Sequence, residues 1–358
     1  MNATKRARRS VTQPGEPASS PRILIIGANG QIGTELAELL VRRHGPDAVI
    51  SADLAASGRV IGIAHEALDV TDAAALATVA KRHRITQVYH LAAALSATGE
   101  KHPQWAWNLN MVGLLNVLEL ARTERLERVF WPSSIAAFGP NTPRDGTPQH
   151  TVMDPTTVYG ISKLAGERWC AWYHANHGVD VRSLRYPGLI SWKTPPGGGT
   201  TDYAVEIFHA ALQHGRYTCF LSEGQALPMM YMPDALRATV ELMEAPAAAV
   251  TQRDGYNLAG ISITPRDIAT AIARRVPGFE IRCEPDFREH IAASWPNSLD
   301  DSAACRDWGW KPEYDLQAMV DDMLENLKTL AASKPRSASA RAARRRPAGV
   351  VQCSVSVR

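Results

Sequence analysis

The sequence Gly27-Ala28-Asn29-Gly30-Gln31-Ile32-Gly33 spells G-x-x-G-x-x-G and stands between an apolar run and a helical pattern. Residues 22–26 have the length of a fully buried strand, and residues 31–43 place apolar side chains at helical spacing. Glycine is needed where the chain turns sharply, where it approaches a pyrophosphate and where the helix packs on the strand. A bare glycine triplet is a weak signal, but this context favours a dinucleotide site at a helix N-terminus.

The pattern of strand, turn and helix repeats along the first half of the chain. Further strands are predicted at residues 49–52, 88–91, 129–132 and 181–186, and helices at 72–82, 105–125 and 157–177. Strands that alternate with helices form a parallel sheet with right-handed crossovers. We therefore predict an α/β fold, with a Rossmann-type doubly wound parallel sheet and a smaller C-terminal substrate lobe.

The regular alternation of strand and helix patterns ends after Gly188. Residues 22–188 are predicted to form the dinucleotide-binding domain, and residues 189–328 mainly the substrate lobe, with some segments returning to the Rossmann sheet. Residues 195–199, Pro-Pro-Gly-Gly-Gly, read as a loop that we expect to close over a ligand. Helices are predicted at residues 202–213, 233–243 and 316–328.

The net charge of +3 over 358 residues comes from the two ends of the chain. Residues 1–21 carry +3 and residues 329–358 carry +7, which leaves −7 for residues 22–328. A folded part of that sign is no general nucleic-acid binder, because phosphate binding needs a positive surface. We expect both ends to be disordered basic tails, the second because its Ala, Ser and Arg residues offer almost no apolar surface to bury.

Compartment and metal content are indicated by what the sequence lacks. It contains no run of about 18 apolar residues, and residues 1–20 lack the apolar segment of a secretory signal. Its five cysteines are odd in number and form no C-x-x-C pair, which favours a reduced compartment and no metal site. We expect a cytoplasmic protein, or one of the mitochondrial matrix if the source is eukaryotic.

Two acidic residues are candidates for the adenosine end of the dinucleotide. Asp53 follows Gly33 by 20 residues at the end of the second strand, where a carboxylate can accept from ribose hydroxyls and repel a 2′-phosphate. This favours NAD over NADP, the alternative being an N-cap for the next segment. Asp69 and Val70, at the end of a short third strand, are expected beside the adenine, although capping of the helix at residue 72 fits them equally well.

Tyr159 and Lys163 lie one helical turn apart, so their side chains face the same way. The spacing is common by chance, but Ser133 and Ser134 end a strand at the carboxyl edge of the sheet, where ligands of such folds bind. A phenol with a pKa of about 10 is a poor base at neutral pH, and a nearby ammonium would lower that pKa. A serine hydroxyl beside it can hold an alcohol or carbonyl oxygen.

Residues 22–328, which carry these motifs, resemble the extended short-chain dehydrogenase/reductase family, also called the NAD-dependent epimerase/dehydratase family. Further markers are Leu91-Ala92-Ala93, Asn110 with Gly113 and Asn116, and Ser134 five residues before Gly139. The resemblance implies that Ser134, Tyr159 and Lys163 are the catalytic set. It also implies NAD contacts from the glycine motif and from Asp53, Asp69, Val70, Leu91, Ala92, Ala93, Asn110, Tyr159, Lys163, Tyr186 and Pro187. An amide satisfied by the main chain remains an open interpretation of Asn110.

Three separated segments resemble one branch of this family, whose members oxidise L-threonine. They are LRYPG at residues 184–188, GGGTTDYA at 197–204 and LPMMYMPD at 227–234. Nucleotide-sugar epimerases and dehydratases usually carry an Arg-Asp pair near the third segment, and this chain offers no cation there for a sugar-nucleotide diphosphate. The resemblance implies NAD-dependent oxidation of the threonine β-hydroxyl to 2-amino-3-oxobutanoate with NADH formation, and a nucleotide-sugar epimerase or dehydratase is the alternative.

The chemistry of threonine predicts which side chains contact it. Asp202 would face the ammonium, and Ser96, Thr200 and Thr201 would donate to the carboxylate. Ser133, Ser134 and Tyr159 would hold the β-hydroxyl. Capping of the helix at residue 202 is a compatible alternative for residues 200–202.

The predicted partners also follow from the resemblance. Helices such as those at residues 105–125 and 157–177 often pair into a four-helix interface in this family, so we expect a homodimer. The other partner is a small-molecule substrate, and we expect neither a nucleic acid nor a membrane.

Overall fold

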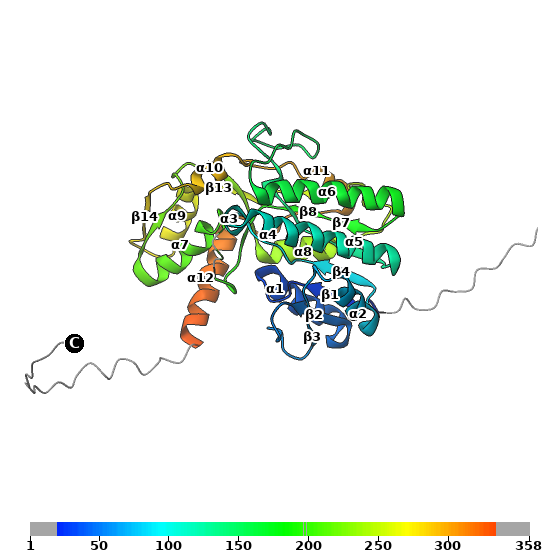
Figure 1. The fold of residues 1–358 in the computed structure, drawn as a ribbon. Helices are drawn as coiled ribbons and strands as arrows, with labels where there is room; N and C mark the ends of the chain where they lie inside the picture. Colours follow the sequence, from blue (N-terminus) through cyan, green and yellow to red (C-terminus); the bar gives the residue numbers. More distant parts are fainter. Residues whose placement is uncertain (1–19, 196, 198, 334–358) are drawn as a thin grey trace, which may run out of the picture.

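The computed structural model describes residues 20–195, 197 and 199–333, which form two lobes (Figure 1). The larger lobe is built on a six-stranded parallel sheet with the strand order β3-β2-β1-β4-β5-β7, which confirms the predicted fold class. Its strands are β1 (Ile23–Ile26), β2 (Val49–Asp53), β3 (Ala64–Ala67), β4 (Gln87–His90), β5 (Arg128–Phe130) and β7 (Val181–Arg182).

Helices cover both faces of this sheet. The helices α1 (Gln31–His44) and α8 (Met232–Glu244) share a core with one face, and α2 (Ala73–His83), α5 (Gly113–Thr123) and α6 (Val158–His177) share a core with the other. Every residue of β1, the sequence ILII, is buried, as expected for a strand covered on both sides. Shorter helices are α3 (Ser96–Lys101), α4 (Pro103–Trp107) and α11 (Ser302–Trp308).

The smaller lobe has a separate core beneath three helices, α7 (Tyr203–His214), α9 (Pro265–Ala273) and α12 (Leu316–Ser333). A parallel pair, β10 (Arg216–Cys219) and β14 (Glu280–Cys283), forms one edge of the lobe, and α10 (Arg288–Ala293) follows it. Two three-stranded sheets complete the fold. One contains β9 (Gly188–Ile190), β11 (Leu227–Tyr231) and β13 (Ile261–Ile263), and the other contains β6 (Ser133–Ser134), β8 (Leu184–Tyr186) and β12 (Tyr256–Asn257).

The chain after residue 188 does not stay in the smaller lobe. Strand β12 pairs with β8, and α8 packs on α1 of the larger lobe. Residues late in the sequence therefore help to support the carboxyl edge of the large sheet, where the first lobe meets the second.

Three elements differ from their sequence-based predictions. The strand expected at residues 181–186 divides at Ser183, because β7 joins the large sheet while β8 pairs with β6. The helix expected at residues 105–125 contains a π-helical turn, Asn108–Val112, between α4 and α5. The last helix runs to Ser333 rather than 328, since Leu330, Ala331 and Ala332 favour helix.

The remainder of the two predicted tails, residues 1–19 and 334–358, lies outside the described residues. Among the helices of the described part, none is both long enough and apolar enough to cross a bilayer.

Candidate active site

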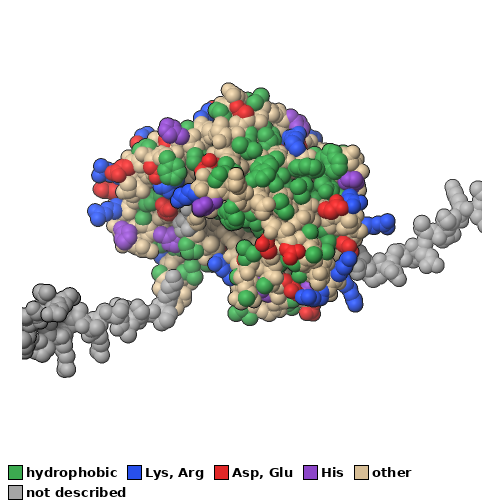
Figure 2. All heavy atoms as spheres, in the orientation of Figure 1, with side chains coloured by type: hydrophobic (Ala, Val, Ile, Leu, Met, Phe, Trp, Pro, Cys, Tyr) green, Lys and Arg blue, Asp and Glu red, His purple; other side chains and the backbone are tan. Residues whose placement is uncertain are grey.

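Two adjoining cavities lie over the carboxyl ends of the parallel strands and share Leu91 and Ala93 in their walls. The space-filling view shows a hollow between the two lobes in this part of the molecule (Figure 2). One cavity contains the glycine motif, and the other contains the predicted catalytic set. Ligands of doubly wound folds bind at this edge of the sheet.

The structure requires glycine at the three positions of the motif for different reasons. Gly27 has a φ of 82°, and a Cβ built on it would lie 2.6 Å from the Ala92 nitrogen. A Cβ on Gly33 would lie 2.3 Å from the Gly27 oxygen, so α1 packs on the turn only because that residue is glycine. Gly30 is the N-cap residue of α1, and the nearest atom to a Cβ there is the Gly27 oxygen at 3.2 Å.

The wall of this first cavity suits the adenosine and pyrophosphate of a dinucleotide. Gly30 lines the cavity, and no side chain caps the N-terminus of α1 among the residues described, so this helix end is open to a ligand. The N–H groups of a helix N-terminus and the helix dipole favour a phosphate anion. Within the same motif, the Asn29 amide donates to the Ser57 oxygen and Gln31 and Ile32 line the second cavity.

The two acidic candidates, Asp53 and Asp69, line the first cavity. The Asp53 carboxylate accepts from the Asn29 N–H at 3.0 Å, and bends and turns rather than a helix follow it, so the N-cap alternative does not apply. Asp69 accepts from the main chain and hydroxyl of Thr71. Asp72 caps α2, so Asp69 and Val70 do not have that role. The third strand ends at Ala67, two residues before Asp69.

Asn110 is buried, and its side-chain amide is hydrogen-bonded to the main chain, as the alternative interpretation of this residue predicts. Its side-chain oxygen accepts from the Ala94 N–H at 2.7 Å, and its amide nitrogen donates to the Ala94 oxygen and to the Ser162 hydroxyl. Ser162 donates in turn to the Tyr159 carbonyl. The π-helical turn therefore fastens the segment after β4 to the first turn of α6, behind Tyr159.

The structure brings Ser134, Tyr159 and Lys163 to the wall of the second cavity. The Ser134 and Tyr159 side chains lie close together in this wall, and the Ser134 hydroxyl accepts from the Ala136 N–H at 3.2 Å. The Lys163 ammonium donates to the Pro132 carbonyl at 2.6 Å and lies 5.4 Å from the centre of the Tyr159 ring. The nicotinamide candidates Tyr186 and Pro187 line the same cavity, although the Tyr186 phenol is hydrogen-bonded to Thr239.

The predicted effect of Lys163 on Tyr159 is wrong in this structure. Burial raises the pKa of Tyr159 to about 12, with Ser134 acting in the opposite direction. Burial also lowers the pKa of Lys163 to about 7, against the negative charge of Glu167. Lys163 is buried and Tyr159 is half-buried, and removal from water disfavours ammonium and phenolate alike.

The predicted substrate residues line the same cavity. Ser96, Thr200, Thr201 and Asp202 all line the cavity, and the buried Thr200 hydroxyl has no hydrogen-bond partner among the described residues. The Asp202 carboxylate accepts from the Gly199 N–H at 2.8 Å instead of capping α7. Ser133 lines the cavity too, but its hydroxyl donates to Glu167.

The sequence-based prediction missed two groups of residues at the site. Trp295 is buried and closes one wall of the cavity from a segment far along the chain, a position that no local pattern indicates. Glu167 and Arg185 form a buried ion pair beneath Ser133. The spacing of Lys163 and Glu167, one helical turn, was the available signal for the second group.

Comparison with known proteins agrees with this geometry. Residues 23–259 match the model of the NAD-dependent epimerase/dehydratase family. The chain belongs to this family. An uncharacterised epimerase/dehydratase of Staphylococcus haemolyticus is 46% identical over 311 residues, which cover 86% of this chain and 98% of that protein.

Solved structures of family members are also similar. The holo form of a GalE-like L-threonine dehydrogenase from Cupriavidus necator is 69% identical, with a TM-score of 0.85 over 86% of this chain and all of that one. A monomeric L-threonine 3-dehydrogenase from a metagenome is 44% identical, with a TM-score of 0.83 over 86% of this chain and 99% of that one.

The cofactor of this NAD-dependent family member is NAD. The residues fit it, because Gly30 leaves open the space at the N-terminus of α1 that a side chain would enter. Gly30, Asp53 and Asp69 would hold the adenosine and pyrophosphate, and the second cavity would hold the nicotinamide beside Tyr159 and Lys163.

Proposed function

We propose that the protein is an L-threonine 3-dehydrogenase that oxidises the β-hydroxyl of L-threonine to 2-amino-3-oxobutanoate with NAD as acceptor. The observation that carries the proposal is the lining of the second cavity, which combines the Asp202 carboxylate, the Thr200 and Thr201 hydroxyls and the Ser134/Tyr159/Lys163 set. This lining matches the ammonium, carboxylate and hydroxyl of a small zwitterion. The threonine dehydrogenases among the solved relatives support the same assignment.

The size and charge of the cavity argue against the alternative, a nucleotide-sugar epimerase or dehydratase. The cavity measures about 180 Å³, below the range of about 300–1,000 Å³ that is typical of sites for drug-sized ligands. Among its described lining residues, Lys163 is the one Lys or Arg, and its ammonium is hydrogen-bonded to Pro132. A sugar-nucleotide diphosphate would lack a cation to neutralise it.

The catalytic residues would work as follows. Tyr159 as phenolate takes the proton of the threonine β-hydroxyl while the C–H bond at Cβ breaks and the C=O bond forms. Ser134 donates to the same oxygen and holds it against Tyr159. When the proton of the pair resides on Lys163, its positive charge offsets part of the cost that burial imposes on the phenolate. When bound, NAD supplies the acceptor for the hydride.

The assignment is tested by following NADH absorbance with threonine, serine, 3-hydroxybutyrate and UDP-sugars as separate substrates. We expect NADH to accumulate with threonine and not with UDP-sugars. An epimerase recycles its NAD, so conversion of a UDP-sugar without net NADH, together with no response to threonine, would support the alternative instead.

The Tyr159–Lys163 pair predicts how the activity depends on pH. The active form has lost one proton from the pair, and the first proton leaves near the lower of the two pKa values, about 7 for Lys163. We therefore expect kcat/KM to rise about tenfold per pH unit below about pH 6 and to level off near pH 8. Initial rates between pH 5 and 8.5 measure this profile, and a flat profile would contradict Tyr159 as the base.

We further propose that a second copy of the chain covers the outer face of α4 and α6, giving a homodimer in the cytoplasm or the mitochondrial matrix. Figure 2 shows hydrophobic side chains gathered over this part of the molecule. Trp107, Ile161, Trp169 and Trp172 are 39–46% exposed there, an unusual set for a surface in contact with water. One similar threonine dehydrogenase is described as monomeric, so the surface and not the family supports the proposal.

The homodimer makes a prediction for a double variant on this face. Replacing Trp169 and Trp172 by glutamate buries two charges at the contact, so we expect a dimer to become a monomer. Light scattering after size exclusion measures the mass. The control is Phe287→Glu, which also charges an exposed aromatic residue, 62% exposed and in the smaller lobe, and should keep the dimer. A wild-type chain of monomer mass would contradict the proposal.

A further inference from the structure

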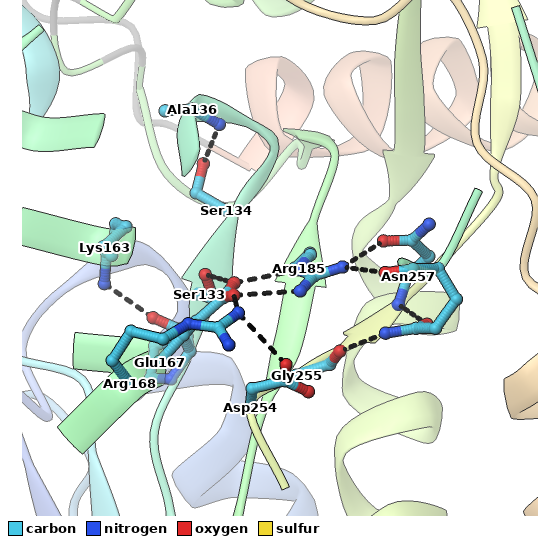
Figure 3. Close-up of polar contacts among 12 residues, drawn as sticks. Ser133, Ser134, Ala136, Lys163, Glu167, Arg168, Arg185, Asp254, Gly255 and Asn257 are labelled. Carbon is cyan, nitrogen blue, oxygen red and sulfur yellow. Dashed lines mark hydrogen bonds and ion pairs between the residues drawn. The ribbon is translucent and has the colours of Figure 1, made fainter. Parts of the chain in front are cut away.

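A buried ion pair lies directly behind the catalytic strand β6. Glu167 on α6 and Arg185 on β8 are 0% and 1% exposed, and two parallel hydrogen bonds of 2.9 Å join the guanidinium to both carboxylate oxygens. Figure 3 shows Ser133 pointing into the same pair. Its hydroxyl donates to Glu167 Oε1 at 2.6 Å.

The guanidinium also donates to partners from two other segments of the chain. Arg185 Nη1 donates to the Gln149 carbonyl at 2.9 Å and to the Asn257 side-chain oxygen at 3.0 Å (Figure 3). Gln149 and Asn257 are bonded to each other as well, through the Asn257 N–H and the Gln149 side-chain oxygen. A fork of this kind fixes orientation as well as charge, and a lysine could not reproduce it.

The pair connects β8 with β6 and α6, the two elements that carry the catalytic set. Strand β6 pairs with β8 so that Ser133 lies opposite Arg185 and Ser134 opposite Tyr186. Lys163 and Glu167 project from one face of α6, one bonding Pro132 and the other Ser133. The segment 132–134 is therefore held at two successive residues by the helix that also carries Tyr159.

We propose that Glu167, together with Arg185, is a positioning residue that sets Ser134 against Tyr159 and places a negative charge one helical turn from Lys163. The proposal rests on the proposed function, because it concerns the same reaction. Glu167 touches neither cavity, since it is absent from their described walls, and it acts through Ser133, Arg185 and Lys163.

The charge effect is consistent with the groups around Lys163. The other titratable and charged groups near Lys163 and Glu167 are Tyr159, Arg168 and Cys170 on α6, His90 on β4 and Asp254 before β12. Glu167 raises the pKa of Lys163 against the larger effect of burial. Without that carboxylate, Lys163 would lose the attraction of its negative charge, and the fraction of the Tyr159–Lys163 pair present as phenolate and ammonium would fall.

The test is the Glu167→Gln variant, which keeps the shape of the side chain and an acceptor for Ser133 but removes the charge. We expect kcat for threonine oxidation to fall about 10- to 100-fold, with KM for threonine and Kd for NADH nearly unchanged. We also expect the acid limb of the kcat/KM profile to move to lower pH. Glu167→Asp keeps the charge and should restore the position of that limb.

The matched control is Asp180→Asn, which breaks another ion pair with a fully buried arginine, Arg182 at 2.7 Å, away from both cavities. It should lower the unfolding temperature while leaving kcat and the acid limb unchanged. If Glu167→Gln does not fold, Ser133→Ala removes one bond of the cluster and should lower kcat several-fold.

The outcomes distinguish a failure of the proposed function from a failure of the positioning role of Glu167. A wild-type chain that forms no NADH from threonine contradicts the proposed function. A wild-type chain that does so, with Glu167→Gln at the wild-type kcat and an unmoved acid limb, contradicts the positioning role. If Asp180→Asn shifts kcat and the limb in the same way, the effect is one of general stability, and the positioning role is also wrong.

Discussion

Tyr159→Phe is expected to lower kcat for threonine oxidation by about 100- to 10,000-fold, the usual contribution of a general base. The phenol lies in the cavity wall beside Ser134 and Lys163, where it can accept the proton of the β-hydroxyl. Phenylalanine keeps the ring beside Lys163, so the shape of the site and the Kd for NADH should hardly change. Steady-state rates and NADH fluorescence titration measure the two quantities.

A second tyrosine provides the control for this substitution. Tyr203 is fully buried at the start of α7, and its hydroxyl has no hydrogen-bond partner among the described residues. Tyr203→Phe removes the same atom from a site that does not line the cavity, so we expect an unchanged kcat and equal or higher stability. A Tyr159→Phe variant that keeps more than about a tenth of the wild-type kcat would contradict its role as base.

The first half of the fold could be predicted closely from the sequence because its signals are local. The apolar run before Gly27, the helical spacing after Gly30 and the strand ending at Asp53 lie within a residue of β1, α1 and β2. Each of these elements is buried by its own hydrophobic pattern. Their order then leaves a parallel sheet as the simplest arrangement.

The elements that were predicted less well depend on contacts from elsewhere in the chain. Residues 181–186, VRSLRY, read as one strand, and only the position of β6 determines that the chain changes sheets at Ser183. The π-helical turn at Asn110 could not be distinguished from a regular helix by the spacing of apolar residues. The hydrogen bond between Asn110 and Ala94 joins two separate segments, so it could not be predicted from that spacing either. Such tertiary choices override local propensity.

The same distinction applies to the candidate site. The spacing of Tyr159 and Lys163 correctly places both side chains on one face, but which partner the ammonium takes depends on the Pro132 carbonyl, which is remote in sequence. The pKa values depend on burial, which spacing does not reveal. Arg185 was part of a recognised motif, yet its pairing with Glu167 follows only from the meeting of α6 and β8.

The second large effect is expected at the glycine motif, where two substitutions should separate folding from cofactor binding. Gly33→Val would place a Cβ 2.3 Å from the Gly27 oxygen, and neither backbone can yield without moving α1 from β1. We expect a lower unfolding temperature and no measurable NADH binding. A Cβ at Gly30 would lie 3.2 Å from the Gly27 oxygen, a tight contact that a shift of a few tenths of an ångström relieves, so we expect Gly30→Val to cost far less stability than Gly33→Val.

The bound cofactor would not tolerate the Gly30 side chain, because it would occupy the space where the pyrophosphate approaches the helix N–H groups. We expect Gly30→Val to raise the Kd for NADH by about 10- to 100-fold, which corresponds to about 1.4–2.7 kcal/mol, at nearly the wild-type unfolding temperature. Calorimetry and thermal unfolding of both variants measure these effects. Wild-type NADH affinity in Gly30→Val would show that the pyrophosphate does not lie against Gly30, and the cavity between Gly30 and Asp53 would then need another ligand.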